Sequence, residues 1–185
     1  MPVTQERIRL KNLKVADFAS EETLCFSATV LFDGKPIAEA RNEGFGGPTH
    51  LRPLTGAQAA LAEAEAYAST LPPYTFNRPG STGPSSDDAL DMSLDFLVDL
   101  LAEELHAGRK LRAAFNRDIG NKALFVRDGT LKYLKGVKLK AYPNQSVVFA
   151  RIREKFGGTI VILNELPTEE AFAVWKQFMA DDTNH

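Results

Sequence analysis

The stretch that decides the fold is residues 23–42, which read T-L-C-F-S-A-T-V-L-F-D-G-K-P-I-A-E-A-R-N. Apolar side chains recur at every second position of its first ten residues, which predicts a strand with one buried face. Asp33-Gly34 then predicts a two-residue turn, so that residues 35–42 return antiparallel to the first strand. Pro36 predicts that this returning strand lies at a sheet edge, because proline has no N–H to donate.

Working outward, residues 7–15 alternate charged and apolar side chains, with a slip of one residue at Asn12. This pattern predicts a half-buried strand with a bulge, which completes an N-terminal antiparallel meander. Residues 44–53, G-F-G-G-P-T-H-L-R-P, contain too many glycines and prolines for a regular element. They are predicted to form a loop.

Two helices are predicted in the middle of the chain. Thr55 and Gln58 have the spacing of a capping box before an alanine-rich helix that extends to Ser69. Ser86 is predicted to begin a second, long helix that extends at least to residue 105 and could continue to Phe115. Its predicted core face is Leu90, Leu94, Leu97, Val98, Leu101 and Leu105.

The C-terminal third predicts a strand-helix-strand-helix layer. Its first part is a hairpin of residues 123–127 and 130–134 around Asp128-Gly129. A helix is then predicted at residues 145–156 and a strand at residues 159–163. A last helix is predicted to begin at Thr168. Phe172, Trp175 and Met179 share one face of the last helix.

The predicted fold class is therefore α+β, with the antiparallel meander packed on a long central helix and followed by the C-terminal layer. The chain has 185 residues, a length typical of one domain, so residues 1–185 are predicted to form a single domain. Its predicted parts are the meander (1–54), a helical middle (55–117) with a flexible linker (71–86), and a basic C-terminal part (118–185).

Composition narrows the functional classes. No apolar run approaches the roughly 18 residues that a membrane span needs, and the first residues show no export signal. The only cysteine, Cys25, cannot form an internal disulfide or a thiolate zinc cage. We therefore expect a cytoplasmic protein with no membrane contact and no cofactor.

Charge is strongly segregated along the sequence. Residues 106–156 hold 13 Lys or Arg against 3 Asp or Glu, a formal charge of +10, whereas the rest of the chain carries −12. Basic side chains alternate with aromatic ones in this segment, and that combination suits phosphates and unpaired bases. The candidate binding residues are Arg109, Lys110, Arg112, Arg117, Lys122, Arg127, Lys132, Tyr133, Lys135, Lys138 and Lys140.

The basic segment permits three interpretations. It could contact nucleic acid, it could contact an acidic protein surface, or it could be an ordinary solvated face. Phe115, Phe125 and Tyr142 also lie in the segment, although the hairpin pattern predicts that Phe125 points into the core.

Acidic residues form a second pattern. Asp91, Asp95, Asp99 and Glu103 recur at four-residue intervals and would form one stripe along the predicted second helix. The alternative hypothesis is a metal-dependent hydrolase or nuclease whose metal site is Asp91, Asp95 and Asp99, completed by His50 or Glu43. The stripe could instead face water, or pair with the basic segment within one chain or across a homodimer.

Other features give catalysis little support. The loop Gly44-Phe45-Gly46-Gly47 lacks the spacing of phosphate-binding loops, and glycines that adopt positive φ explain it better. A lone His50 lacks a nucleophile or a second ligand, and Cys25 has no histidine near it in sequence. We expect binding rather than enzymatic activity.

Two segments carry a resemblance to known proteins. Residues 20–36, S-E-E-T-L-C-F-S-A-T-V-L-F-D-G-K-P, and residues 162–167, I-L-N-E-L-P, resemble small uncharacterised proteins of bacterial phages and mobile elements. The resemblance implies an accessory role, such as handling DNA or RNA or inhibiting a host defence. It assigns no site residue, because the matching motifs are a hairpin and a strand-to-helix turn.

Overall fold

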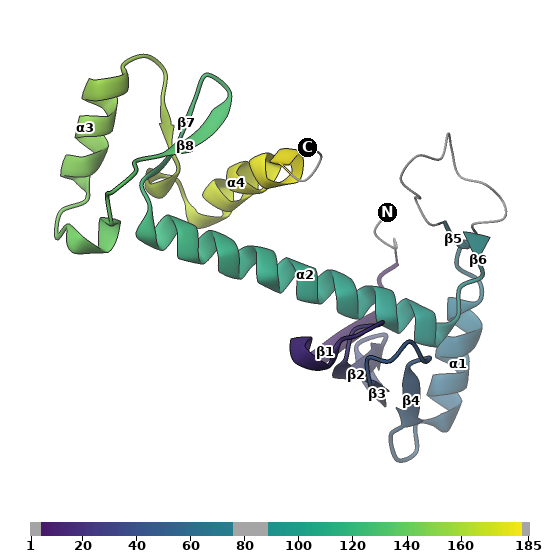
Figure 1. Cartoon of the computed structure of the whole chain (residues 1–185). Coiled ribbons are helices and arrows are strands. Elements are labelled where there is room, and N and C mark those ends of the chain that lie inside the picture. Colours follow the sequence, from purple (N-terminus) through teal and green to yellow (C-terminus); the bar gives the residue numbers. More distant parts are fainter. Residues whose placement is uncertain (1–4, 76–88, 183–185) are drawn as a thin grey trace. The chain divides into compact units, whose positions relative to one another are not determined.

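The computed structural model describes residues 5–75 and 89–182 (Figure 1). Contacts within the chain divide it into two compact units, residues 1–107 and 108–185. The α+β class is confirmed, since helices and antiparallel sheets occur together. The boundary between the units falls inside a helix rather than at the predicted limit of the basic part, and the single domain inferred from length stays a prediction.

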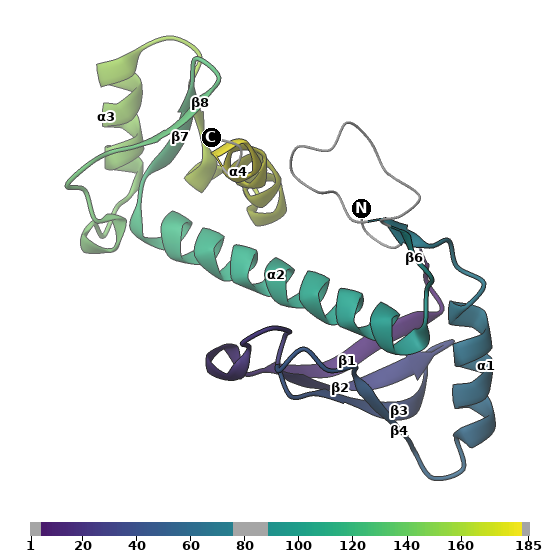
Figure 2. The same ribbon diagram turned by 45° about the vertical axis from the view of Figure 1, so that its right-hand side comes forward.

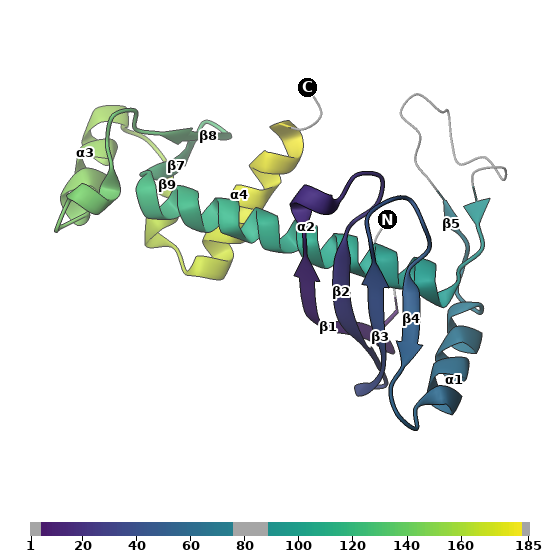
Figure 3. The ribbon, with the colours of Figure 1, turned by 60° about the horizontal axis from the view of Figure 1, so that its bottom comes forward.

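Residues 1–107 contain the predicted meander, extended by one strand (Figure 3). The sheet has the order β1-β2-β3-β4, and every neighbouring pair is antiparallel. Its strands are β1 (Ile8–Val15), β2 (Phe26–Phe32), β3 (Lys35–Asn42) and β4 (His50–Pro53).

Two local predictions in this sheet are confirmed. The register of β1 against β2 shifts between Lys11 and Lys14, and Asn12 between them has a φ of 55°. The turn from β2 to β3 has positive φ at both central residues, 49° at Asp33 and 78° at Gly34. Positive φ at both positions is the type I′ geometry that joins twisted antiparallel strands.

Two other predictions for the sheet are wrong. β3 is an interior strand, because β4 pairs with it from His50 to Pro53, a segment predicted to be loop. Pro36 lies where the register against β2 shifts, a place where a missing N–H is tolerated. The glycines and Pro48 precede β4, and Leu51 then pairs with Ala40 and packs on the core, which makes the segment a strand.

Helix α1 (Gln58–Ala68) forms without the predicted capping box. Its N-cap residue is Ala57, and no side chain caps it. Gly56, with a φ of 78°, turns the chain just before the helix. In the predicted linker, β5 (Tyr74–Thr75) pairs with β6 (Ala89–Leu90), and residues 76–88 lie outside the described residues.

Helix α2 (Leu94–Asn121) begins eight residues later than predicted and ends six residues beyond Phe115. Ser93 rather than Ser86 precedes its first turn, and the Phe96 amide donates to the Ser93 hydroxyl at 3.4 Å. Leu94, Leu97 and Val98 are buried as expected, but Leu90 and Leu105 are exposed. Leu90 is exposed because it belongs to β6 and not to the helix.

The core of the first unit lies between one face of the β1–β4 sheet and two helices. Val30, Phe26 and Ala38 from the sheet belong to the same buried cluster as Leu61 of α1 and Leu97 of α2. The strand alternation therefore buries one sheet face, as the sequence predicted.

In residues 108–185 a small antiparallel sheet of order β8-β7-β9 separates two apolar clusters. Phe125 faces the cluster formed with α3, whereas Leu124 faces the cluster formed with α4 and the end of α2. Figure 2 shows α3 and α4 on opposite sides of β7 and β8. The elements are β7 (Leu124–Arg127), β8 (Thr130–Tyr133), α3 (Ser146–Phe156), β9 (Val161–Ile162) and α4 (Thr168–Asp182).

Two local predictions in this unit are confirmed, whereas the buried strand predicted at residues 159–163 is only the two residues of β9, of which Val161 is exposed. Asp128 and Gly129 have φ values of 52° and 68°, the turn expected between β7 and β8. Trp175 is buried, with Phe172 and Met179 packed in the same cluster.

Asn164, which no sequence pattern identified, connects β7 to the end of α2. Its carboxamide oxygen accepts a hydrogen bond from the Leu124 amide, and its nitrogen donates to the Ile119 and Lys122 carbonyls.

Candidate functional site

The two units carry opposite net charges. Residues 108–185 hold 14 Lys or Arg against 8 Asp or Glu, whereas residues 1–107 hold 8 against 16. The candidate binding residues from Arg109 to Lys140 all lie in the basic unit. What they could bind depends on which of their side chains the fold already occupies.

Three of the candidate cations are occupied within the chain. The Arg112 guanidinium pairs with Glu169 and lies 4.5 Å from the ring centre of Phe172. Lys122 pairs with Asp118 at 2.9 Å, and Arg127 pairs with Asp128 at 3.1 Å. The ring of Tyr133 is also engaged, since the Lys122 ammonium lies 5.1 Å from its centre. These residues contribute to the fold, and the sequence did not distinguish them from the others.

Two aromatic residues of the basic segment are unable to stack on bases, contrary to the nucleic-acid hypothesis. Phe115 and Phe125 are fully buried and therefore cannot stack on a base without unfolding the core. Tyr133 and Tyr142 are exposed. The aromatic side chains that a ligand can reach in this segment are thus the two tyrosines rather than the phenylalanines.

The remaining candidates reach solvent. Arg109 and Lys110 lie exposed on α2. Five further cations are exposed, and among residues 89–182 no ion pair is described for any of them; they are Arg117, Lys132, Lys135, Lys138 and Lys140.

Apolar side chains fix the positions of the exposed lysines after β8. Leu134, Val137 and Leu139 pack against the cluster beneath α3, so the lysines between them point outward. Lys132 lies on the same sheet face as its cross-strand partner Phe125, which belongs to that cluster. A basic surface thus surrounds one apolar cluster.

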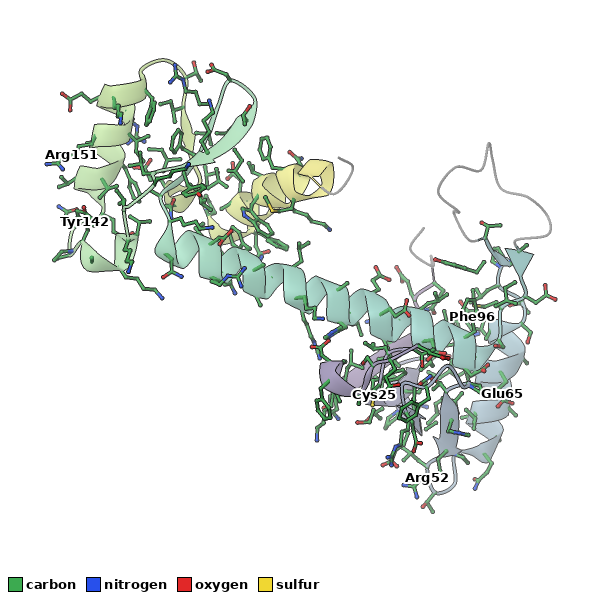
Figure 4. All side chains as sticks on the ribbon, in the orientation of Figure 1. Cys25, Arg52, Glu65, Phe96, Tyr142 and Arg151 are labelled. Carbon is green, nitrogen blue, oxygen red and sulfur yellow. The ribbon has the colours of Figure 1, made fainter. Side chains whose placement is uncertain are left out.

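Arg151 extends this surface and was missing from the predicted site. In α3 the buried residues are Val148, Phe149 and Ile152, so helical spacing places Arg151 outward. Figure 4 labels Arg151 and Tyr142 on the side of α3 that faces away from β7 and β8. We call the group Lys132, Lys135, Lys138, Lys140 and Arg151 the α3-side basic surface.

The predicted acidic stripe forms on α2 from Asp95, Asp99 and Glu103, but without Asp91. Asp91 precedes α2 and lies outside the helix, because Ser93 and not Ser86 precedes the first turn. Asp95 accepts a hydrogen bond from the Ser93 hydroxyl, and Asp99 from Thr49. Within residues 5–75 and 89–182, no three His, Cys, Asp or Glu side chains are grouped so that they could hold a metal ion. The alternative metal site therefore gains no geometric support.

Asp99 belongs to a polar network that holds the loop after β3. The Asn42 carboxamide donates to the Gly47 carbonyl at 3.1 Å and to the Thr49 hydroxyl at 3.0 Å, and the Thr49 hydroxyl donates to Asp99. Burial raises the pKa of the Asp99 carboxyl above its ordinary value, although the Thr49 hydrogen bond opposes the rise. The network is structural and leaves a partly desolvated carboxylate.

Asp99→Asn is expected to raise the melting temperature at pH 7. Because the folded chain holds the Asp99 proton more tightly than the unfolded chain, this group's contribution to stability falls as pH rises from 3.8 through the raised pKa, and it stays low above that pH. Asparagine removes the charge and keeps an oxygen that accepts from Thr49. The gain should shrink as pH falls toward 3.8, and calorimetry across pH measures it.

Asp95→Asn is the matched control, because Asp95 lies in the first turn of α2, where a carboxylate favours the helix. This variant should be slightly less stable at pH 7, by about 0.3–1 kcal/mol. A lower melting temperature for Asp99→Asn would show instead that the ionised Asp99 stabilises the fold through Thr49.

The glycine loop is organised by internal hydrogen bonds. The Gly44 amide donates to the Asn42 side chain at 2.9 Å, and the Gly46 amide to the Thr23 hydroxyl at 3.3 Å. These amides are thus already used, and Gly44 and Gly46 have φ values of 90° and 82°. The geometry agrees with a turn that requires positive φ rather than with a phosphate cradle.

The other residues considered for catalysis, His50, Glu43 and Cys25, are not arranged as a nucleophile beside a general base. His50 is exposed on β4, opposite Arg41 of β3. Glu43 lies 3.5 Å from the Arg41 guanidinium. Cys25 is half-buried and lines an open cavity of about 550 Å³ together with Lys14, Arg41 and Phe45.

Comparison with known proteins gives no match. No family model, no curated protein and no solved structure matches this chain. The resemblance to phage proteins therefore stays an expectation, and function is argued from the site alone. No helix in the described part of the chain is long and apolar enough to cross a membrane.

Proposed function

We propose that this chain is a non-enzymatic binding protein whose α3-side basic surface contacts the phosphates of nucleic acid. The observation that carries the proposal is the outward placement of Lys132, Lys135, Lys138, Lys140 and Arg151 with no described carboxylate partner. Cations that are held apart from acidic partners displace counterions from a phosphate backbone, which favours association at low salt.

Neighbouring features support the same ligand. Tyr142 is exposed beside this surface and offers a ring and a hydroxyl to a sugar or a base. The Arg153 guanidinium pairs with Glu165, so it adds no free cation to the phosphate contact. A binding role, without chemistry on the ligand, requires only these contacts. An accessory role in handling nucleic acid follows from them, in a phage or mobile-element setting if the resemblance holds.

An acidic protein surface is the alternative ligand, because carboxylates could replace phosphates on exposed lysines. Nucleic acid is favoured because the exposed ring of Tyr142 lies beside these cations, and a ring can stack on a base but gains nothing from a carboxylate. The same experiment decides between them.

The triple variant Lys132→Glu, Lys135→Glu, Lys138→Glu should bind oligonucleotides about 10- to 100-fold more weakly at 50 mM salt, because each change turns a phosphate contact into a repulsion. Fluorescence anisotropy with labelled 30-mer duplex and single-stranded DNA and RNA measures the affinity. For the unmodified protein, affinity should fall steeply between 50 and 200 mM salt.

Lys176→Glu is the matched control, because Lys176 is also exposed in residues 108–185 but lies on α4, across the sheet from α3. It should bind within about threefold of the unmodified chain, as expected for a cation outside the contact. Absence of binding to every oligonucleotide at 50 mM salt would overturn the nucleic-acid proposal. Equal losses in the triple variant and the control would show that total charge, not this surface, drives binding.

A further inference from the structure

The uncovered face of the β1–β4 sheet gathers the cations of an otherwise acidic unit. Cross-strand partners lie on one face of an antiparallel sheet, and the pairs Lys11 with Thr29, Thr29 with Glu39, and Glu39 with Arg52 connect all four strands. The cations on this face are Arg9, Lys11, Lys14, Arg41 and Arg52. They are five of the eight Lys or Arg in residues 1–107.

Cations outnumber carboxylates on this face, although Glu43, just after β3, pairs with Arg41 at 3.5 Å. Glu39 is the only carboxylate in the paired positions of the face, and it pairs with Arg52. For Arg9, Lys11 and Lys14 no ion pair is described within residues 5–75 and 89–107. The acidic total of the unit therefore conceals a basic surface.

The opposite face of the sheet carries the core. Helix α1 and the first turns of α2 pack on the face that holds Val30 and Phe26. Figure 3 shows the four strands in front of α2. Within residues 5–75 and 89–107, the side chains of the basic face are exposed or half-buried, so this unit leaves the face open to a ligand.

A cavity opens at the end of this face where β1 and β3 end and β2 begins. Its volume is about 550 Å³, within the range of small-ligand pockets, and its lining includes Lys14, Phe45 and the paired Arg41 and Glu43. Phe45 is 62% exposed, and Phe18, in the turn after β1, is 94% exposed. The Phe45 ring is therefore open to a planar ligand that stacks on it.

The loop that presents Phe45 is held in place. The amides of Glu21, Glu22 and Thr23 all donate to the Gly44 carbonyl, at 3.1, 2.9 and 3.3 Å. Asn42 and Thr23 fix the glycines on either side of Phe45 through hydrogen bonds to the Gly44 and Gly46 amides. The ring thus stands beside the cavity on an ordered loop, so little ordering entropy is lost when a base stacks on it.

We propose that this sheet face binds single-stranded nucleic acid, with a phosphate on Lys14 and an unpaired base against Phe45 at the cavity. The proposal rests on the nucleic-acid function proposed above and names the form of the ligand. Exposed rings on a flat sheet bind unpaired bases by stacking, whereas the bases of a duplex are already stacked on each other. The α3-side basic surface supplies phosphate contacts that do not distinguish the two forms.

Phe45→Ala should weaken binding to a labelled 30-mer single strand about 10-fold, because one stacked base contributes about 1–3 kcal/mol. Binding to the duplex of the same sequence should be unchanged. Phe45→Tyr should retain single-strand binding, since the tyrosine ring stacks equally well. Fluorescence anisotropy at 50 mM salt measures each affinity.

A charge pair tests the phosphate contacts. Lys14→Glu, at the cavity, should lower single-strand affinity about 10-fold, as expected when an attraction becomes a repulsion. Lys35→Glu makes the same change at the opposite end of the sheet, beside the β2–β3 turn, and should change the affinity less than threefold. Equal losses in the two variants would overturn the site, and unlabelled polyglutamate that competes as well as the single strand would show a face that recognises charge alone.

The two proposals fail in different ways. If the single-strand proposal is wrong, Lys14→Glu and Phe45→Ala bind as the unmodified chain does, while the α3-side triple variant still loses affinity for both forms. If instead the α3-side surface has no role, the triple variant binds normally and Lys14→Glu alone weakens binding. Absence of binding to all oligonucleotides overturns both.

Discussion

Gly44→Ala is expected to lower the free energy of unfolding by about 3–5 kcal/mol, among the largest effects of a single substitution. A Cβ at this position would lie 2.1 Å from the Ala19 carbonyl oxygen and 2.9 Å from the Cys25 Cβ. Alanine also strongly disfavours the φ of 90° that Gly44 adopts. The loop must therefore shift, and the three amides that donate to the Gly44 carbonyl lose their acceptor.

Gly47→Ala is the control, because no atom lies within 4 Å of its added Cβ and its φ is not in the left-handed region. Its free energy of unfolding should change by no more than about 0.5 kcal/mol. Urea denaturation followed by far-UV circular dichroism compares the two variants. If both unfold at the same urea concentration, the Gly44 turn is not the constraint that the geometry indicates.

Local patterns predicted the hairpins and the bulge because each depends on a few neighbouring residues. Asp-Gly pairs accept positive φ at two successive positions, so the turns at Asp33 and Asp128 followed from the dipeptide alone. The alternation of β1 located the slip at Asn12 for the same reason. Such features need no knowledge of distant parts of the chain.

Elements that depend on distant partners were missed. β4 forms because Leu51 and His50 pair with β3, whereas the glycines and Pro48 just before it favoured a loop for the whole of residues 44–53. Two serines could have preceded α2, and local propensity favoured Ser86, with two aspartates after it, over Ser93. The wrong start of the helix then extended the acidic stripe to Asp91.

The sequence identified the basic residues of the candidate site but not which of them are exposed and unpaired. Counting charges located the basic segment, but whether a cation is free depends on carboxylates far away in sequence, such as Glu169 for Arg112. The basic sheet face was concealed for the opposite reason, because its five cations lie in a half with twice as many acids. The alternation of Arg9 and Lys11 with Ile8 and Leu10 was the available signal, and only the strand register adds Arg41 and Arg52 to it.

Phe115→Ala is expected to lower the free energy of unfolding by about 3–5 kcal/mol, because it removes a fully buried ring from the second unit. The ring centre of Phe115 lies 5.2 Å from that of Phe172 and 5.7 Å from that of Trp175. The Arg112 guanidinium lies 5.8 Å from the Phe115 ring centre and also loses that contact. A cavity would remain where three aromatic rings now pack together.

Trp175 is the only tryptophan of the chain, so its fluorescence during urea unfolding follows the cluster that Phe115 occupies. Phe18→Ala makes the same chemical change at a 94% exposed ring and should alter stability by no more than about 0.5 kcal/mol. If the single domain predicted from length is correct, circular dichroism and fluorescence shift together in Phe115→Ala; separate transitions would mean that residues 1–107 unfold independently. A Phe115→Ala chain that keeps its stability but loses affinity for single strands would make Phe115 a stacking residue, contrary to its burial.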